Sequence, residues 1–551
     1  MRGRIFGLLI GAAAILPPAA VAADPCGALA ARVLIMARGG QVRPRNDPFL
    51  QAPAVTPAPA TIARSGPLAP ATAARSRRAA PATVAPAIVA PSRRQAAATI
   101  ARSTRRSAPP PKKPSPTVTS ELARLYRTQQ IDLADYRSYS ASLSAALSTE
   151  KRLRGTRAVE LEAVIENLHD IAAAGELTPS RLPALFLTLD NNRQWWTTGP
   201  IPFPGQLIEF TGSQLVWEYY PGQGIELQVL ATFGRADGMY TAGSTQYPQL
   251  RELLSEMIPL AAQRGGGLTW EYYFHFDGGS PPWTSAMSQG TAVEALTRAA
   301  LAFGQGSETA GGPDPPSPAP GSQPATGYLQ LAHRALPIFT VAPPTGVSIS
   351  APAGARYVQY SFQPGTDILN AFLQSLIGLY DYARVSGDPV AQRLFAAGNA
   401  EAEAEVPRFD TGAWSLYQPG VEDSLSYHEL VTGFLQQLCS RTSAPVYCTT
   451  SQHFQTYLTT PPALALLTSS ATAKRAFTVR FHLSKYSHVG IVIARGQSTV
   501  FLTSASFGYG VDSFAVPSLP AGNYTVRLAA TDLAGNFNRI TGALQVLPGK
   551  K

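Results

Sequence analysis

From Thr117 to about residue 460, the sequence is a succession of amphipathic helical segments. Apolar residues recur at i, i+3 and i+4 spacing, first in residues 121–147 and then in about ten segments joined by short aromatic strands and glycine-rich loops. Helices in such a succession bury their apolar faces against one another. The pattern predicts an α/α toroid, an incomplete α/α barrel, over residues 117–462, in which the loops at one end form a cleft.

After Pro461-Pro462 the periodicity changes to two. Apolar and polar residues alternate between Gly, Pro and Asn turns, which is typical of the short strands of an all-β immunoglobulin-like or fibronectin-like sandwich. We therefore predict a mainly α protein with a β-sandwich at residues 472–549. Such modules are usually accessory, serving glycan binding, display or spacing.

The N-terminus predicts export. Arg2 and Arg4 precede a short apolar run, and Ala20-Val21-Ala22 supplies an A-x-A cleavage site, so residues 1–23 are expected to be a signal peptide. The apolar run is about half of the ~20 residues that a membrane-spanning helix needs, and no transmembrane span is expected. The predicted location is secreted or in the cell envelope.

Residues 24–116 are rich in Ala, Pro and Arg and are predicted to be a disordered linker. Residues 32–113 hold fifteen basic residues against one acid, Asp47, a net charge of +14, whereas residues 117–551 hold 28 basic and 33 acidic residues. The formal net charge of +10 therefore comes from the linker, and the folded part is mildly acidic. An acidic folded part argues against a nucleic-acid partner. The basic segment is expected to tether the protein electrostatically to an anionic cell-surface polymer.

The cysteines predict structure and not chemistry. Cys439 and Cys448 bracket a short loop in a chain that is expected to be exported to an oxidising compartment, so a disulfide between them is predicted. Cys26 then has no cysteine left to pair with in the sequence. Without clustered histidines, three cysteines give no metal site. The sequence lacks GxSxG, HExxH, Walker and dinucleotide-binding motifs, and no cofactor is expected.

A near-repeat pairs LVWEYYPGQG (215–224) with LTWEYYFHFDGG (268–279). In an extended strand, alternate side chains face opposite sides, so Glu218 and Tyr220 share one face. In the second segment, Glu271 is expected to face away from Trp270 and Tyr272 in the same manner. One face is then core, and the other lines a cleft.

Several segments resemble the C-terminal domain of the D-glucuronyl C5-epimerases, which invert C5 of glucuronate units in heparan-type polysaccharides. The segments that carry the resemblance are YPGQGIELQVLATFG (220–234), PWTSAMSQGTAVEALTRA (282–299), YVQYSFQPGTDILNAFLQSLIGLYD (357–381), FDTGAWSLY (409–417) and YH (427–428). The resemblance spans about residues 215–460 and implies an α/α catalytic domain in a secreted, bacterial-type member with an added β-sandwich.

By this resemblance, Tyr360, Tyr417 and Tyr427 fall on the family's catalytic tyrosine positions, and Asn370 falls on its substrate-binding Asn. C5 epimerisation needs a base on one face of the sugar, an acid on the other, and donors or cations for the carboxylate. Tyr360 and Tyr427 would be the opposed acid and base, and Tyr417 a donor. Further residues expected to bind substrate are Gln359, Arg356, Glu218, Tyr220 and Glu271. His428 is expected either to bind the substrate carboxylate or to orient a tyrosine.

Two positions depart from the animal pattern. Gln359 stands where animal members have Glu, and Gly420 stands where they have Arg. Gln cannot accept a proton and Gly cannot bind a carboxylate. Either neighbours such as Glu218, Glu271, Arg356 or Arg235 compensate, or the substrate or the reaction differs.

The leading hypothesis is an exported isomerase that converts D-glucuronate to L-iduronate within an anionic uronate polysaccharide. One alternative is a lyase, because the same C5 carbanion can expel the C4 substituent. Another is a glycan-binding protein of the cell envelope that performs no reaction.

Overall fold

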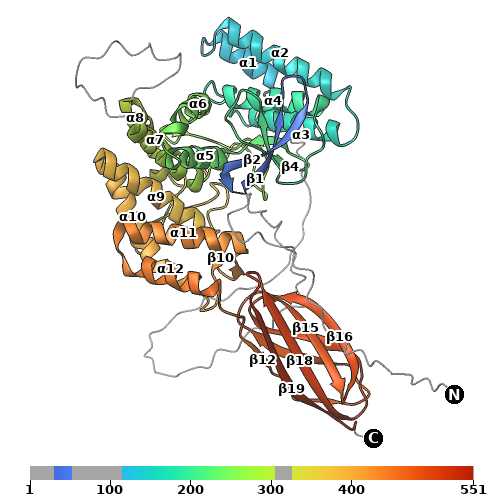
Figure 1. The fold of residues 1–551 in the computed structure, drawn as a ribbon. Coiled ribbons are helices and arrows are strands. Elements are labelled where there is room, and N and C mark those ends of the chain that lie inside the picture. Colours follow the sequence, from blue (N-terminus) through green and yellow to red (C-terminus); the bar gives the residue numbers. More distant parts are fainter. Residues whose placement is uncertain (1–29, 52–114, 304–324, 550–551) are drawn as a thin grey trace, which may run out of the picture. The chain divides into compact units, whose positions relative to one another are not determined.

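The computed structural model describes residues 30–51, 115–303 and 325–549 (Figure 1). The predicted signal peptide (1–23), Cys26 and most of the predicted linker lie outside the described residues. Across the described ranges, no helix combines the length and the apolar character that crossing a bilayer would require.

Helices dominate residues 118–457. The α-helices are α1 (Val118–Arg127), α2 (Leu133–Glu150), α3 (Thr156–Ala173), α4 (Leu182–Thr198), α5 (Val229–Thr241), α6 (Tyr247–Met257), α7 (Ala286–Ala302), α8 (Ala325–Arg334), α9 (Leu369–Ser386), α10 (Pro389–Glu405), α11 (Leu425–Thr442) and α12 (Pro445–Tyr457). Short 3-10 turns are η1 (Ser244–Gln246), η2 (Ile258–Leu260), η3 (Pro337–Thr340) and η4 (Val406–Phe409). The prediction of a mainly helical region is confirmed, and its closure into a toroid stays a prediction.

Strands occur in small sheets between the helices and in a larger group at the C-terminal end. The first set is β1 (Ala30–Met36), β2 (Val42–Gln51), β3 (Leu207–Phe210), β4 (Trp217–Tyr220), β5 (Gly224–Leu227), β6 (Ala262–Arg264), β7 (Gly267–Thr269), β8 (Ser348–Ser350), β9 (Ala355–Tyr357), β10 (Leu416–Gln418) and β11 (Val421–Glu422). The second set is β12 (Leu464–Leu466), β13 (Ser470–Thr472), β14 (Phe477–Leu483), β15 (Ser487–Arg495), β16 (Ser498–Phe507), β17 (Gly510–Val516), β18 (Gly522–Asp532) and β19 (Phe537–Leu547).

The centre of the helical region is a close crossing of α7 and α9. A Cβ on Gly378 would lie 2.0 Å from the carbonyl oxygen of Gly290, and a Cβ on Gly290 would lie 2.6 Å from Cα of Ser375. Glycine is therefore needed at both positions for the two backbones to approach. Both helices are buried along most of their length, so they fix the loops that precede them, including the segment with Tyr360.

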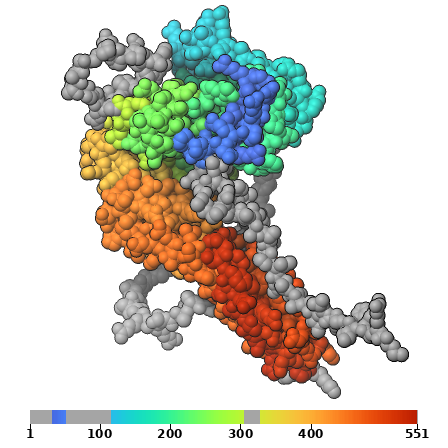
Figure 2. Space-filling view, in the orientation of Figure 1, coloured from blue at the N-terminus to red at the C-terminus, as the bar shows by residue number. Residues whose placement is uncertain are grey.

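Part of the predicted linker is folded. Strands β1 and β2 form an antiparallel hairpin, and β1 also pairs in parallel with β3, which gives a five-stranded sheet in the order β2-β1-β3-β4-β5. The hairpin (blue) lies beside α5 (Figure 2), and β2 contacts that helix. The prediction of disorder is thus wrong for residues 30–51, because Val33 and Met36 are buried and Arg45 bonds to Glu209.

The strands β12–β19 form what we call the C-terminal β region. They make two sheets, in the orders β12-β14-β17 and β13-β19-β18-β15-β16, and side chains of both sheets share one apolar cluster. Alternating burial along β14 and β18 matches the period of two in the sequence. A β-rich C-terminal region is confirmed, and its description as a sandwich stays a prediction.

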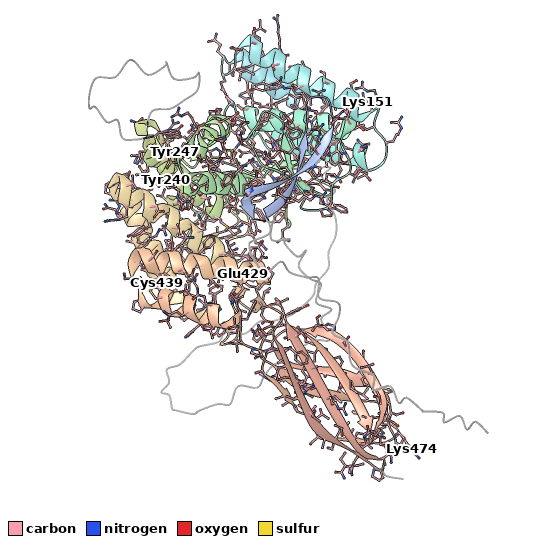
Figure 3. All side chains as sticks on the ribbon, viewed as in Figure 1. Lys151, Tyr240, Tyr247, Glu429, Cys439 and Lys474 are labelled. Carbon is pink, nitrogen blue, oxygen red and sulfur yellow. A yellow bond between two sulfur atoms is a disulfide. The ribbon has the colours of Figure 1, made fainter. Side chains whose placement is uncertain are left out.

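The predicted disulfide is present between Cys439 and Cys448. It joins α11 to α12, and Figure 3 labels Cys439 on α11, together with Glu429 near the start of that helix. Because the predicted site residues Tyr427 and His428 lie in the first turn of α11, the disulfide fixes the helix that carries them.

A buried carboxylate shapes the turn between β4 and β5. Glu160 on α3 accepts hydrogen bonds from the Tyr219 hydroxyl (2.8 Å) and from the N–H groups of Gly222 (2.9 Å) and Gly224 (3.0 Å). A Cβ on Gly224 would lie 2.5 Å from Val164, and its φ is +83°, so the turn requires glycine there. This turn fixes the strand that holds Glu218 and Tyr220.

Glu160→Gln is expected to destabilise the protein by about 2–4 kcal/mol, because a Gln amide nitrogen cannot accept from the turn N–H groups. Glu166→Gln, on an exposed position of the same helix, is the matched control and should change stability by less than about 0.5 kcal/mol. The measurement is equilibrium unfolding in urea. Equal unfolding midpoints for the two variants would contradict this role for Glu160.

Candidate functional site

Three tyrosines from distant parts of the chain meet in one place. Tyr360 follows β9, Tyr417 lies on β10, and Tyr427 is in the first turn of α11. The hydroxyl groups of Tyr360 and Tyr417 are hydrogen-bonded to each other, and the rings of Tyr417 and Tyr427 are 5.1 Å apart. All three residues are partly exposed. We call Tyr360, Tyr417 and Tyr427 the tyrosine trio, and its members are the three predicted catalytic positions.

The hydroxyl of Tyr360 is a hydrogen-bond acceptor for two neighbouring side chains. Its hydroxyl oxygen receives hydrogen bonds from Tyr417 and from the side chain of Gln359, and both lower its pKa. Burial and the nearby Tyr427 act in the opposite direction and raise the pKa of Tyr360 to about 12. Burial and the same hydrogen bond raise the pKa of Tyr417, which keeps its proton as donor. Gln359 thus assists ionisation of Tyr360 as a donor, although it cannot accept a proton.

An aromatic wall surrounds Tyr360 and leads to Glu218. The Tyr360 ring lies 5.7 Å from Phe276, 5.8 Å from Trp283 and 5.3 Å from Phe362. Tyr220 packs on the same Phe276 ring at 6.1 Å, and its hydroxyl donates to Oε2 of Glu218 (2.9 Å). Glu218 and Tyr220 therefore lie along the aromatic wall that contacts Tyr360, and their expected role in substrate binding stays a prediction.

Glu218 is a carboxyl group held by neutral donors. Its Oε2 also accepts a hydrogen bond from Nε2 of Gln228 (2.7 Å), and burial raises its pKa. The amide oxygen of Gln228 accepts from the Tyr272 hydroxyl (3.3 Å), which lies 2.7 Å from Oγ of Ser288. The sequence analysis missed Gln228, although it directly precedes α5 within the segment that carries the resemblance.

His428 supports the trio from inside the protein. Its ring stacks on Trp414 with centroids 3.8 Å apart, and Nε2 lies 2.9 Å from the carbonyl of Phe454. Because a carbonyl only accepts, Nε2 carries the proton and Nδ1 is the acceptor for Ser415. Burial lowers the pKa of His428 to about 4, so the ring is neutral. Of its two predicted roles, contact with substrate is corrected because His428 is fully buried, and a role in orienting the adjacent Tyr427 stays a prediction.

Asn370 acts locally at the start of α9. Its Oδ1 accepts a hydrogen bond from the N–H of Ala371 (2.8 Å), and the residue is buried. This contact satisfies one free N–H group of the helix N-terminus. The structure thus shows only this local contact for Asn370, and its expected role in substrate binding stays a prediction.

The predicted cations are bound by carboxylates. The guanidinium of Arg356 pairs with Glu405 and lies between the rings of Phe372 and Phe409. Arg235 pairs with Asp47 (2.7 Å) and Glu209 (3.1 Å), and both arginine side chains are buried. The expectation that either one binds a substrate carboxylate is therefore corrected, because each is already neutralised inside the protein.

Glu271 is structural. Its carboxylate accepts two hydrogen bonds from Arg181 (2.7 and 2.9 Å), one from Arg264 (2.7 Å) and one from the hydroxyl of Tyr273 (3.1 Å). Residues 270–273 are buried outside a regular strand, so the alternation expected from the near-repeat does not hold for Glu271. Its predicted role in substrate binding is corrected, since the carboxylate is wholly buried in this ion pair.

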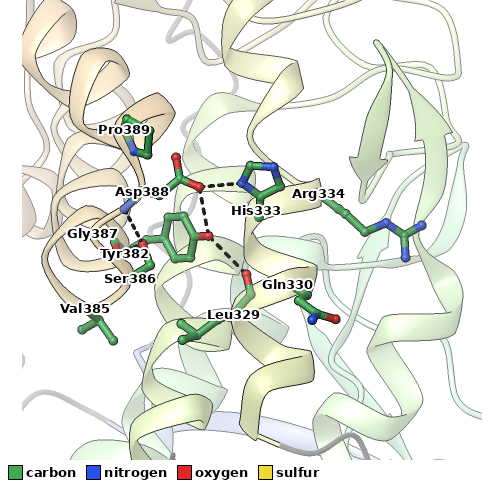
Figure 4. A pocket seen from close by; sticks show the side chains of 10 residues that line it. All are labelled: Leu329, Gln330, His333, Arg334, Tyr382, Val385, Ser386, Gly387, Asp388 and Pro389. Carbon is green, nitrogen blue, oxygen red and sulfur yellow. Dashed lines mark hydrogen bonds and ion pairs between the residues drawn. The ribbon is translucent and has the colours of Figure 1, made fainter.

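A pocket lies between α8 and the end of α9, where the chain turns into α10 (Figure 4). There the Asp388 carboxylate caps α10 and lies 2.5 Å from Nδ1 of His333. None of the predicted site residues lines this pocket. The described residues contain no group of three or more His, Cys, Asp and Glu side chains placed to hold a metal ion.

Comparison with known proteins finds a family match for the region that contains the trio. Residues 324–456 match the family described as "D-glucuronyl C5-epimerase C-terminus", which confirms the resemblance for these residues. A D-glucuronyl C5-epimerase of Caenorhabditis elegans is 31% identical over 150 residues, which are 25% of this chain and 21% of that protein. The chain thus matches about a fifth of that relative's length.

Two solved structures show only weak similarity. A sugar epimerase from a ruminal bacterium gives a TM-score of 0.27 at 15% identity, over 42% of this chain and 57% of that one. A double mutant of the Cellulomonas fimi endo-beta-1,4-mannanase gives a TM-score of 0.12 at 12% identity, over 69% and 84%. Neither score is high enough to relate the folds.

Two glutamates that the sequence predicted as equivalent should respond differently to amidation. Glu271→Gln is expected to cost about 3–5 kcal/mol of folding stability, because it leaves buried arginines without their partner. Glu218→Gln, whose partners are neutral, is expected to cost about 1 kcal/mol or less. Equilibrium unfolding of both variants checks this, and equal losses would contradict the structural assignment of Glu271.

Proposed function

We propose that this protein is an exported epimerase that inverts C5 of D-glucuronate units in a polysaccharide, with the tyrosine trio as its acid–base groups. The proposal builds on the family match over residues 324–456, which contains all three tyrosines. The observation that carries it is the Tyr360 hydroxyl, whose oxygen accepts hydrogen bonds from Tyr417 and Gln359. Two donors on one phenol oxygen stabilise the phenolate that C5 proton abstraction requires.

In the proposed reaction, the Tyr360 phenolate takes the C5 proton, and the C5–H electron pair moves into the carboxylate to give an enediolate. Tyr427 then returns a proton to the opposite face of C5. The two tyrosines exchange protonation states over the cycle, and no oxidant or reductant is consumed. Tyr417 keeps its proton and remains the donor to Tyr360.

The charges around the trio favour neutral donors for the substrate carboxylate. Asp277 and Asp423 raise the pKa values of Tyr360 and Tyr417, respectively, and Arg356 and Arg235 are paired elsewhere. In this proposal Glu218, held by Tyr220 and Gln228, binds the substrate beside the trio. The aromatic wall of Phe276, Trp283 and Phe362 would stack against sugar rings.

The finer architecture and location belong to the same proposal. Residues 117–462 would close into an α/α toroid that holds the trio in its cleft, and the C-terminal β region would be a sandwich. The signal peptide would place the protein in the cell envelope or outside the cell. There the basic residues of the linker would hold it near an anionic uronate polymer, its substrate.

Deuterium exchange tests the reaction. Incubation with glucuronate polymers in D₂O should introduce deuterium at C5, and Tyr360→Phe should slow this by about 10²- to 10⁴-fold because the base is lost. Tyr126→Phe, on an exposed position of α1, is the matched control and should keep the wild-type rate. Absence of label across a broad polymer panel with folded protein would refute the proposal. An unsaturated, ultraviolet-absorbing product would instead indicate a lyase. Glycan binding without measurable turnover, with an affinity that Tyr360→Phe leaves unchanged, would indicate a binding protein.

The pH dependence tests which group is the base. Because the pKa of Tyr360 is raised to about 12, only a small fraction is ionised at pH 7, and that fraction grows with pH. We therefore expect kcat/KM to rise about tenfold per pH unit between pH 7 and 10. Gln359→Leu removes a donor, raises the pKa of Tyr360 further and should lower kcat/KM at every pH in this range. A plateau below pH 9 would assign the base to another group.

A further inference from the structure

We propose that the C-terminal β region is part of the working site, because Glu422 and Lys485 join it to the segments that carry Tyr417 and Tyr427. This inference rests on the proposed function of the trio. It goes beyond the expectation of an accessory module. Glu422 and Lys485 are positioning residues, since each acts through the backbone or through other side chains.

The first connection passes through Glu422. This residue is the last of β11, and it pairs with Leu416 of β10, directly beside Tyr417. Its Oε1 accepts a hydrogen bond from the N–H of Tyr486 (2.9 Å), and its Oε2 accepts one from the N–H of Tyr509 (2.9 Å). Both donors belong to loops of the C-terminal β region. The two-stranded β10–β11 hairpin is thus held at one end by backbone donors of that region.

The second connection passes through Lys485. Its buried Nζ pairs with Asp532 (2.6 Å) and donates to the carbonyls of Tyr457 (2.8 Å) and Thr460 (2.6 Å). The same Nζ lies 5.1 Å from the centroid of the Trp414 ring. The Lys485 ammonium group therefore joins the C-terminal β region to the end of α12. It also lies over the ring of Trp414, which is close to the trio.

Trp414 transmits this contact to Tyr427. Its indole N–H donates to the carbonyl of Asp423 (2.9 Å), and its ring stacks on His428, the residue after Tyr427. The Tyr417 and Tyr427 segments are therefore both held by residues of the β region. Proton transfer between C5 of the substrate and the phenols on either side is sensitive to displacements of about 1 Å, so loss of either connection should slow the reaction.

Further contacts make the junction continuous. The side-chain amides of Asn536 and Asn538 donate to the carbonyls of Leu458 (2.9 Å) and Pro462 (2.8 Å). The chain passes from α12 into the β region within a few residues, so these bonds fix the connecting segment against the β region. The junction is built from charged and amide groups that each have a stated partner.

The test uses the full-length chain with Glu422→Gln, because Gln can accept only one of the two N–H groups. We expect kcat for C5 deuterium incorporation to fall about tenfold, with KM changed less than twofold. Hydrogen exchange measured by mass spectrometry should become about tenfold faster in peptides covering residues 414–430 and stay unchanged in α3. Glu403→Gln, an exposed change on α10, is the matched control and should alter neither readout.

The double variant Lys485→Met/Asp532→Asn removes the second connection without leaving an unpaired buried charge. It should give the same pattern of lower kcat and faster exchange in residues 414–430. Unchanged kcat and exchange in both variants would overturn the inference, as would exchange that increases equally throughout the chain. If the wild-type chain turns over no polymer, the proposed function fails, and the exchange data alone decide whether the β region holds the trio segments.

Discussion

The cost of burying an unpaired charge decides which chemistry is open to this protein. Arg181, Arg235 and Arg356 are all buried, and each is neutralised by a carboxylate of the protein. A guanidinium that is released from such a pair leaves an uncompensated charge in the interior, which costs several kcal/mol. Arg235 and Arg356, which the sequence analysis considered for binding a substrate carboxylate, thus stabilise the fold through their ion pairs. The tyrosine trio is left with neutral hydrogen-bond donors.

This division explains how a site that lacks the animal Glu and Arg can still be organised for proton transfer. A Gln beside Tyr360 cannot act as a base, but its N–H group supports a phenolate. The aromatic wall lowers the local polarity, which disfavours the ionised phenol and strengthens each hydrogen bond to it. In the proposed reaction, the Tyr360 phenolate is then a base that is weakly populated at neutral pH and strongly basic when it forms.

Much of the fold could be predicted from the sequence, because periodicity reports burial directly. The i, i+4 pattern locates helices such as α9 and α11, and the change after Pro462 to a period of two locates the C-terminal strands. The trio could be predicted through the resemblance, since its members are close to recognisable short segments. The alternation in β4 correctly separated Glu218 and Tyr220 from the buried Trp217 and Tyr219.

The errors arise where long-range pairing decides the outcome. Arg356 and Glu271 are suitable for a uronate site by residue type, but their partners Glu405 and Arg181 are 49 and 90 positions away in the chain. The hairpin β1–β2 is hidden by a composition typical of disorder, because its stability comes from pairing with β3. No local pattern reports such partners.

The position of that hairpin gives the N-terminal segment a protective role. Strand β1 covers the backbone edge of β3, which would otherwise present unpaired N–H and C=O groups to other chains. A protein shortened to begin at Thr117 would expose this edge and become prone to strand-to-strand association between molecules. The hairpin is therefore a segment on which the solubility of the sheet depends.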